Sequence, residues 1–239
     1  VRMECFLAKE MPAVRTDALK IAKNAAQCLM NSAQPANTPL AYFPPTYYKA
    51  PDNQSGWPAH VFIINKGKTM FLEAVQAADA YLDLYDATKD KNYLDLACHI
   101  ADTYRNHQND DGSWPIKVEI STGKSVDNSF CTPTPLFELI RRLKKNYNVT
   151  GYDEMVQKGE QWMRDHALKE FNLTGQFEDQ RMEDLKPHQN LTNCTAIEYA
   201  SYLLAKEKPT AEEIKDATDL VYFSEDQFAH WDILPDENG

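Results

Sequence analysis

Glycine is scarce in this sequence, with eight residues among 239. Neither a glycine-rich phosphate loop nor a Gly-x-Ser-x-Gly turn occurs, and the low glycine content argues against nucleotide-loop chemistry. The five cysteines are scattered singly and never form Cys-x-x-Cys, so the sequence predicts neither a zinc site nor a disulfide scaffold. The metal-binding spacings His-x-x-x-His and Glu-x-x-His are missing as well. We therefore expect no metal and no cofactor.

Long apolar runs and an excess of basic charge are also missing. No stretch of about eighteen apolar residues occurs, so no segment is expected to span a membrane. The net charge is −11 and the isoelectric point is near 5.0. Nucleic acid is therefore not an expected partner, and simple solubility is the favoured explanation of the acidity. Because the chain starts at Val1 with no recognisable signal peptide, we expect a processed product or a piece of a longer protein.

Helical periodicity is the feature that the sequence has in abundance. Residues 92–107 show it best, since Tyr93, Leu96, Ile100 and Tyr104 form the stripe of an amphipathic helix. Short links such as 89–91 require consecutive helices to be antiparallel neighbours. The predicted helices are 15–31, 70–88, 92–107, 133–147, 152–167, 193–206 and 209–223.

Three features recur at a nearly constant distance along the chain. Tyr85-x-x-Thr88 and Tyr147-x-x-Thr150 lie 62 positions apart, as do the apolar residues of the helices that follow them. The turn Gly112-Ser-Trp114 is followed 63 positions later by Gly-Gln-Phe at 175–177. A constant offset indicates a repeated helical hairpin, which buries its apolar face only against neighbouring hairpins. Long crossings between the hairpins favour a closed α/α toroid over an open solenoid.

Two segments depart from the helical pattern. Residues 33–58 contain six prolines together with many aromatic residues. Prolines exclude a helix and the aromatics argue against a disordered linker, so we expect a long ordered loop that covers either a cleft or the core. Residues 117–120 alternate Lys-Val-Glu-Ile before Ser-Thr-Gly-Lys, which predicts a small β-hairpin.

The most distinctive short segment is Gln108–Pro115, which reads Gln-Asn-Asp-Asp-Gly-Ser-Trp-Pro. It combines two adjacent acids, a glycine and a large aromatic residue. A similar segment at 174–179 reads Thr-Gly-Gln-Phe-Glu-Asp. If the repeat is regular, both turns lie on one rim of the hairpin array and their acidic residues converge.

The pattern Gln108-x-x-x-Gly112-x-Trp114 resembles the glutamine–tryptophan turn of α/α toroids. This turn recurs in terpenoid cyclases and, as Asp-Gly-Ser-Trp, in six-hairpin glycosidases. Residues 175–179 and 223–228 resemble uncharacterised bacterial toroid proteins grouped with carbohydrate-active enzymes. The resemblance spans residues 70–231 and implies an all-α fold of stacked antiparallel helical hairpins. With about seven helices, the single domain 1–239 would form an α/α toroid or part of one.

The same resemblance implies a bacterial protein, either periplasmic, secreted or cytoplasmic, and leaves the oligomeric state open. A terpenoid cyclase is disfavoured because no Asp-x-Asp-Asp motif occurs. The main hypothesis is a glycoside hydrolase or polysaccharide lyase that acts on an oligo- or polysaccharide in a cleft on the toroid face. The alternative is a non-catalytic module that binds a glycan or a protein with the same rim.

Sugar chemistry uses two carboxyl groups that flank the scissile bond and aromatic rings that stack on the sugar. The candidate catalytic acids are Asp110, Asp111, Glu178 and Asp179. The candidate substrate-binding residues are Trp57, Trp114, Trp231, Gln176 and His188. A purely structural interpretation stands beside this one: Trp114 packs between hairpins, and the two aspartates simply form the turn before Gly112.

Overall fold

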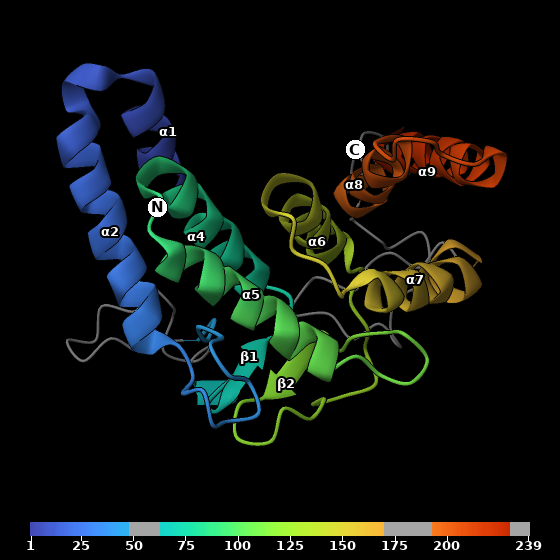
Figure 1. The fold of residues 1–239 in the computed structure, drawn as a ribbon. Helices are drawn as coiled ribbons and strands as arrows, with labels where there is room; N and C mark the ends of the chain where they lie inside the picture. Colours follow the sequence, from blue (N-terminus) through green and yellow to red (C-terminus); the bar gives the residue numbers. More distant parts are fainter. Residues whose placement is uncertain (48–62, 170–192, 230–239) are drawn as a thin grey trace, which may run out of the picture. The chain divides into compact units, whose positions relative to one another are not determined.

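The computed structural model describes residues 1–47, 63–169 and 193–229 of the chain. They are mostly helical, with one two-stranded sheet (Figure 1), which confirms the predicted all-α class. The chain divides into two compact units. The first comprises Val1–Gln108, Lys117–Asn128 and Leu139–Thr150, and the second comprises Asn109–Ile116, Ser129–Glu138 and Gly151–Gly239.

The first unit begins with a helical hairpin. Helix α1 (Arg2–Glu10) leads through a 3₁₀ turn (Pro12–Val14) into α2 (Arg15–Ser32), and the two helices pack against each other. Helix α2 matches the predicted helix 15–31, whereas α1 was not predicted. The reason is its small buried face: only Cys5 and Ala8 of α1 are buried, so the helix lacks a stripe of large apolar residues.

A second hairpin, α4 (Ala74–Thr88) and α5 (Lys91–Asn106), forms the core of this unit. Helix α4 ends at Lys89, which has a left-handed φ of 59°. The carboxylate of Asp90 accepts a hydrogen bond from the Asn92 N–H and so caps α5. The two-residue link makes the helices antiparallel, as the sequence predicts.

The described part of the proline-rich loop, residues 33–47, packs on this core. The side chains of Leu40, Phe43 and Tyr47 are buried, and the ring of Tyr42 stacks on His99 with centroids 4.3 Å apart. The Thr103 hydroxyl holds the loop by donating to the Ala41 carbonyl. An ordered, packed loop was predicted, and the structure agrees over these residues.

Strand β2 (Lys117–Glu119) lies where the hairpin was predicted, and the Glu119 N–H closes the turn by donating to the Lys124 carbonyl. The strand also pairs with β1 (Lys68–Met70), in antiparallel register with Thr69 opposite Val118. The sequence prediction was wrong here, because it started a helix at Met70. A strand of three residues is too short to show the alternation that identifies strands.

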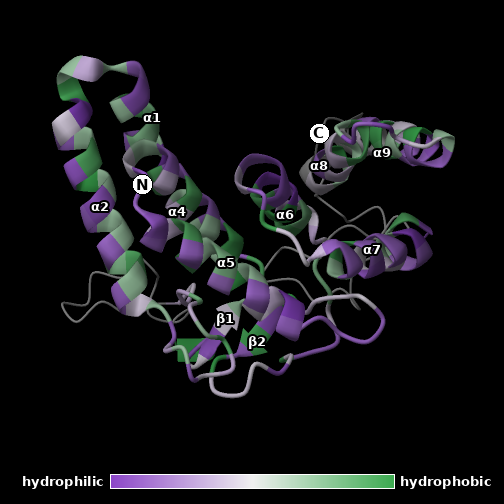
Figure 2. Cartoon of the chain, in the orientation of Figure 1, coloured by the Kyte–Doolittle hydropathy of each residue, from purple (hydrophilic) through white to green (hydrophobic). Residues whose placement is uncertain are grey.

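The remaining helices are α6 (Thr134–Tyr147), α7 (Asp153–Trp162), α8 (Asn193–Leu204) and α9 (Ala211–Ala229). Helix α7 continues as a π-helical segment, Met163–Leu168. Polar and apolar residues both occur along the long helices, as amphipathic helices require (Figure 2). Helices α8 and α9 pack together as a third hairpin.

The hairpin repeat is visible in the backbone. Helices α5 and α7 start at Lys91 and Asp153, which lie 62 positions apart. Two positions earlier in each case, Lys89 and Gly151 both have a positive φ, of 59° and 100° respectively. The 62-residue offset therefore corresponds to a repeated way of ending one helix and starting the next.

Candidate functional site

The Asn109–Ile116 turn is built around Gly112. The Gly112 N–H donates to the Asn109 carbonyl over 2.9 Å, and Gly112 has a φ of 93°. A Cβ atom at this position would lie 2.3 Å from the carbonyl oxygen of Lys158 in α7. Only glycine meets both demands, because its backbone tolerates positive φ and leaves room for the neighbouring chain. The turn is thus docked directly on α7.

Trp114 continues this docking and is 1% exposed. Its ring packs edge-on against Phe137 of α6, with centroids 6.3 Å apart. A Cβ added at Gly159 of α7 would lie 2.8 Å from Trp114 Cζ3, so the indole also lies against α7. The prediction that Trp114 stacks on a substrate is therefore corrected in favour of the structural interpretation: the ring is a core residue, because it fills the space between α6 and α7.

The two aspartates of the turn have different environments. Asp111 Oδ1 accepts hydrogen bonds from the Ser113 N–H over 2.9 Å and from the Ser113 hydroxyl over 2.6 Å. Asn109 donates to the same hydroxyl, so Asp111 is held in a local network that shapes the turn. Asp110 is exposed and has no hydrogen bond or ion pair with the residues that the structure describes. Both side chains are exposed, but Asp111 Oδ1 is engaged in the turn, whereas Asp110 takes no part in its hydrogen bonding.

Six of the predicted site residues lie outside the described ranges: Trp57, Gln176, Glu178, Asp179, His188 and Trp231. The convergence of the two acidic turns therefore stays a prediction.

A polar cluster that the sequence did not reveal joins α7, α8 and α9. Lys206 Nζ lies 2.7 Å from Glu160 Oε1 and 2.6 Å from Glu213 Oε1, and the Tyr202 hydroxyl donates to Glu160 over 2.5 Å. Burial raises the pKa of Tyr202, and the charge of Glu160 raises it further. Burial opposes the charge on Lys206, but its two glutamate partners outweigh this and raise its pKa.

Both shifts favour a protonated tyrosine and a charged lysine, and in these forms the two side chains bond to glutamates of α7 and α9. One part of this polar cluster can be recognised in the sequence. Thr210 and Glu213 bond reciprocally at the start of α9, in the capping-box pattern Thr-x-x-Glu.

A second polar cluster lies in the first unit, where Arg142 of α6 bridges three aspartates of α4. The guanidinium is 3.1 Å from Asp79, 2.6 Å from Asp83 and 3.3 Å from Asp86. The Tyr147 hydroxyl donates to Asp86 over 2.7 Å. Four charged groups satisfy one another here, and they are only partly buried. The cluster ties α6 to α4 and offers no unpaired acid for catalysis.

The buried thiols are poor nucleophiles. Burial raises the pKa of Cys131 to about 12 and, with the charge of Asp83, that of Cys5 to about 11. Both thiols therefore stay protonated near neutral pH, and the reactive form of cysteine is the thiolate.

Two negative findings apply to the described ranges alone. Over residues 1–47, 63–169 and 193–229, no group of three His, Cys, Asp or Glu side chains is placed to hold a metal ion. None of the helices in these ranges combines the length and the apolar character needed to cross a bilayer.

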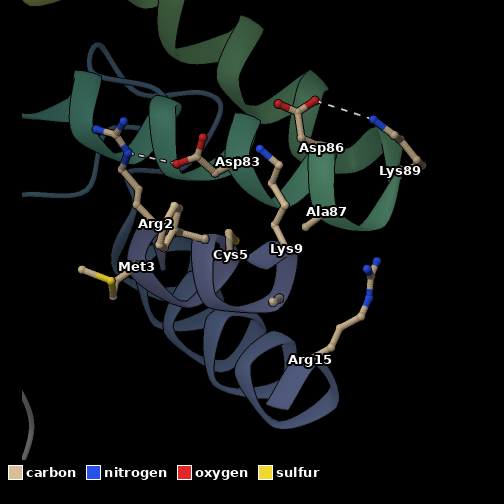
Figure 3. Close-up of a pocket in the computed structure, with 11 residues that line it drawn as sticks. Arg2, Met3, Cys5, Lys9, Arg15, Asp83, Asp86, Ala87 and Lys89 are labelled. Carbon is tan, nitrogen blue, oxygen red and sulfur yellow. Dashed lines mark hydrogen bonds and ion pairs between the residues drawn. The ribbon is translucent and has the colours of Figure 1, made fainter. Parts of the chain in front are cut away.

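An open groove of about 1020 Å³ runs between α1, the start of α2 and the end of α4 (Figure 3). The cationic side chains in its lining are Arg2, Lys9, Arg15 and Lys89. The apolar side chains of Met3 and Phe6 lie among them. The two acids in the wall, Asp83 and Asp86, already have ion-pair partners in Arg2, Lys89 and Arg142. The groove is therefore cationic and apolar, although the chain as a whole is acidic.

Comparison with known proteins adds no family assignment. No protein-family model matches the chain, and the searches found no matching curated protein and no matching solved structure.

Proposed function

We propose that this chain is an α/α-toroid module, or part of one, of a carbohydrate-active protein. In this proposal the Asn109–Ile116 turn presents Asp110 to an oligo- or polysaccharide. The observation that carries the proposal is the division of roles within the turn. Gly112, Trp114 and Asp111 hold its backbone against α6 and α7, which leaves Asp110 exposed and without a partner among the described residues.

The contacts between successive hairpins support the toroid part of the proposal. Within the first unit, α6 contacts α4 through Arg142, and the rings of the repeat-equivalent residues Tyr85 and Tyr147 lie 5.5 Å apart. Within the second unit, Phe137 of α6 contacts Tyr202 of α8, with ring centroids 5.3 Å apart. Each of these contacts joins helices that are not consecutive in the chain, as stacked repeats require.

Glycoside hydrolysis assigns different tasks to its two carboxyl groups. The proton donor is an acid whose environment keeps it protonated, whereas the nucleophile or base is ionised. Asp110 is exposed, so we assign it the nucleophile or base role. Glu178 or Asp179 of the second turn would supply the acid. A separation of about 5–5.5 Å would give retention of configuration, and about 6.5–9.5 Å would give inversion.

The test is a screen of polysaccharides for binding and turnover, followed by two matched variants. Asp110→Asn should lower turnover at least about 100-fold, as the loss of a catalytic carboxylate does, without changing the unfolding midpoint. Asp111→Asn removes the same charge one residue away but keeps an acceptor oxygen for Ser113, so it should retain most of the activity.

The other outcomes decide between the alternatives. Binding without turnover would favour the non-catalytic glycan-binding module. Full activity of Asp110→Asn, or an equal loss in both variants, would reject the role of Asp110. The absence of any glycan binding would reject the proposal as a whole.

A further inference from the structure

Helices α1 and α2 present a surface that combines exposed apolar and cationic side chains, here called the α1–α2 surface. Met3 and Phe6 are 67% and 58% exposed, and Met11 and Val14 are exposed beside them. The outer face of a surface helix is normally polar. Contiguous exposed apolar residues rimmed by polar ones are typical of an interaction site.

The charge of this surface is opposite to that of the chain. Helices α1 and α2 contribute five cations, Arg2, Lys9, Arg15, Lys20 and Lys23, against three acids, Glu4, Glu10 and Asp17. Three of them, Arg15, Lys20 and Lys23, form no ion pair with a described residue and line a shallow depression next to the groove. An acidic partner could therefore pair with these cations without breaking ion pairs that already exist.

Helix α9 presents the complementary combination, here called the α9 surface. Tyr222 is 62% exposed, and Ile214 and Val221 are exposed on the same stripe, at the helical spacing i, i+7, i+8. The adjacent face of α9, with Ala217 and Leu220, is buried. The helix carries six acidic residues and one basic residue.

Acidic residues lie along and beside the apolar stripe of this surface. Glu212 and Glu225 are exposed; the carboxylate of Glu212 lies 3.5 Å from Arg164, and that of Asp219 pairs with Lys215. An apolar helix face with acidic borders is the natural partner of an apolar groove with cationic walls.

We propose that the α9 surface of one copy of this chain docks in the α1–α2 surface of a second copy. The groove, at about 1020 Å³, is at or above the roughly 300–1,000 Å³ of small-ligand pockets, which suits a helix face with several large side chains. Met3 and Phe6 contact the Val221 and Tyr222 side chains, and the charges on both borders set the orientation. The two surfaces belong to the first and last hairpins in chain order, α1–α2 and α8–α9, and each is exposed.

Because the two surfaces differ, each contact joins unlike surfaces. Two copies that dock reciprocally close into a dimer, whereas one contact per pair leaves one surface of each kind free and gives longer assemblies as the concentration rises. The borders are exposed and charged, so the association weakens at high ionic strength.

The test uses the whole chain and two surface variants. Met3→Ser/Phe6→Ser removes the apolar part of the α1–α2 surface, and Val221→Ser/Tyr222→Ser removes that of the α9 surface. All four residues are exposed, so circular dichroism should show native folding. The mass is measured by light scattering after gel filtration, or by sedimentation, over a range of protein and salt concentrations.

Three results are expected. The wild-type mass increases with protein concentration and decreases with added salt. Each variant alone has a self-association dissociation constant at least about tenfold above that of the wild type, so it is monomeric at concentrations where the wild type associates. An equimolar mixture of the two variants forms a complex of two chains and nothing larger, because each variant supplies the surface that the other lacks. A control variant, Ile63→Ser/Ile64→Ser, removes two exposed apolar side chains elsewhere and should associate like the wild type.

Several results would overturn the proposal. A wild-type chain that stays monomeric at every concentration would show that the surfaces do not bind each other. If the α9 variant still dimerised while the α1 variant did not, the contact would be between two α1–α2 surfaces. Association that neither variant weakens would place the interface elsewhere.

Discussion

Replacing Gly112 with alanine tests the docking of the acidic turn on α7. Alanine at a positive φ of 93° costs about 1–2 kcal/mol, since the Cβ atom meets the backbone. The new methyl group would also lie 2.3 Å from the Lys158 carbonyl oxygen, which is backbone and cannot rotate away. Forcing extra atoms into a packed site costs about 1–3 kcal/mol more. We therefore expect Gly112→Ala to lower the free energy of unfolding by about 2–5 kcal/mol.

The measurement is urea denaturation followed by far-UV circular dichroism and by tryptophan fluorescence, because Trp114 is packed beside the turn. Gly67→Ala is the matched control. Gly67 also has a positive φ, of 75°, but an added Cβ would meet no atom within 4 Å. The Gly67→Ala variant should therefore lose only about 1–2 kcal/mol of unfolding free energy, from the positive φ alone. Equal losses in the two variants would refute the close approach of the turn to α7.

Three further predictions concern the polar clusters and a thiol. Arg142→Met should lower the unfolding free energy by about 1–3 kcal/mol in urea titrations, because three aspartates of α4 lose their partly exposed cation. Hydrogen bonds to Lys206 and Thr210 outweigh burial and lower the pKa of Glu213 in the folded chain. The stabilisation from Glu213 is therefore fully present above the pKa of an unfolded-state glutamate, about 4.3, and is lost as the pH falls through the lower pKa of the folded state. The Glu213→Gln variant should flatten this part of the plot of unfolding free energy against pH. Buried Cys131, with its pKa near 12, should resist alkylation at pH 8 while exposed Cys28 reacts, as mass spectrometry of iodoacetamide-treated protein would show.

The long helices could be predicted from the sequence because their signal is local. Helix α5, for example, buries Tyr93, Ile100 and Tyr104, and these residues recur at the spacing of one helical face. The hairpin repeat could be predicted for the same reason, since the link after α4 and the link after α6 use equivalent positions. The residues within each link determine where one helix ends and the next begins, without contacts from distant parts of the chain.

The features that could not be predicted depend on contacts between distant residues. Strand β1 exists because Thr69 pairs with Val118, far along the chain, and three residues of strand carry no pattern of their own. The Arg142 cluster likewise requires α6 to approach α4. Trp114 was a candidate for substrate binding because a tryptophan beside two acids suits sugar recognition, and packing in the core was the alternative. Its burial follows from the positions of Phe137 and Gly159, which the sequence does not reveal.

The contacts of the Asp-Gly-Ser-Trp turn show which of its residues pack the fold and which one is left for chemistry. Gly112 and Trp114 meet α6 and α7, and Asp111 orders the backbone between them through Ser113. In this chain the three residues have a packing role whether or not it binds a sugar. Packing by itself therefore accounts for the motif, and the carbohydrate proposal rests on Asp110 and on the second acidic turn, which lies outside the described residues. Assigning a function from the motif alone would treat residues that pack the turn as catalytic residues. The decisive variants therefore change Asp110 and keep Asp111, Gly112 and Trp114.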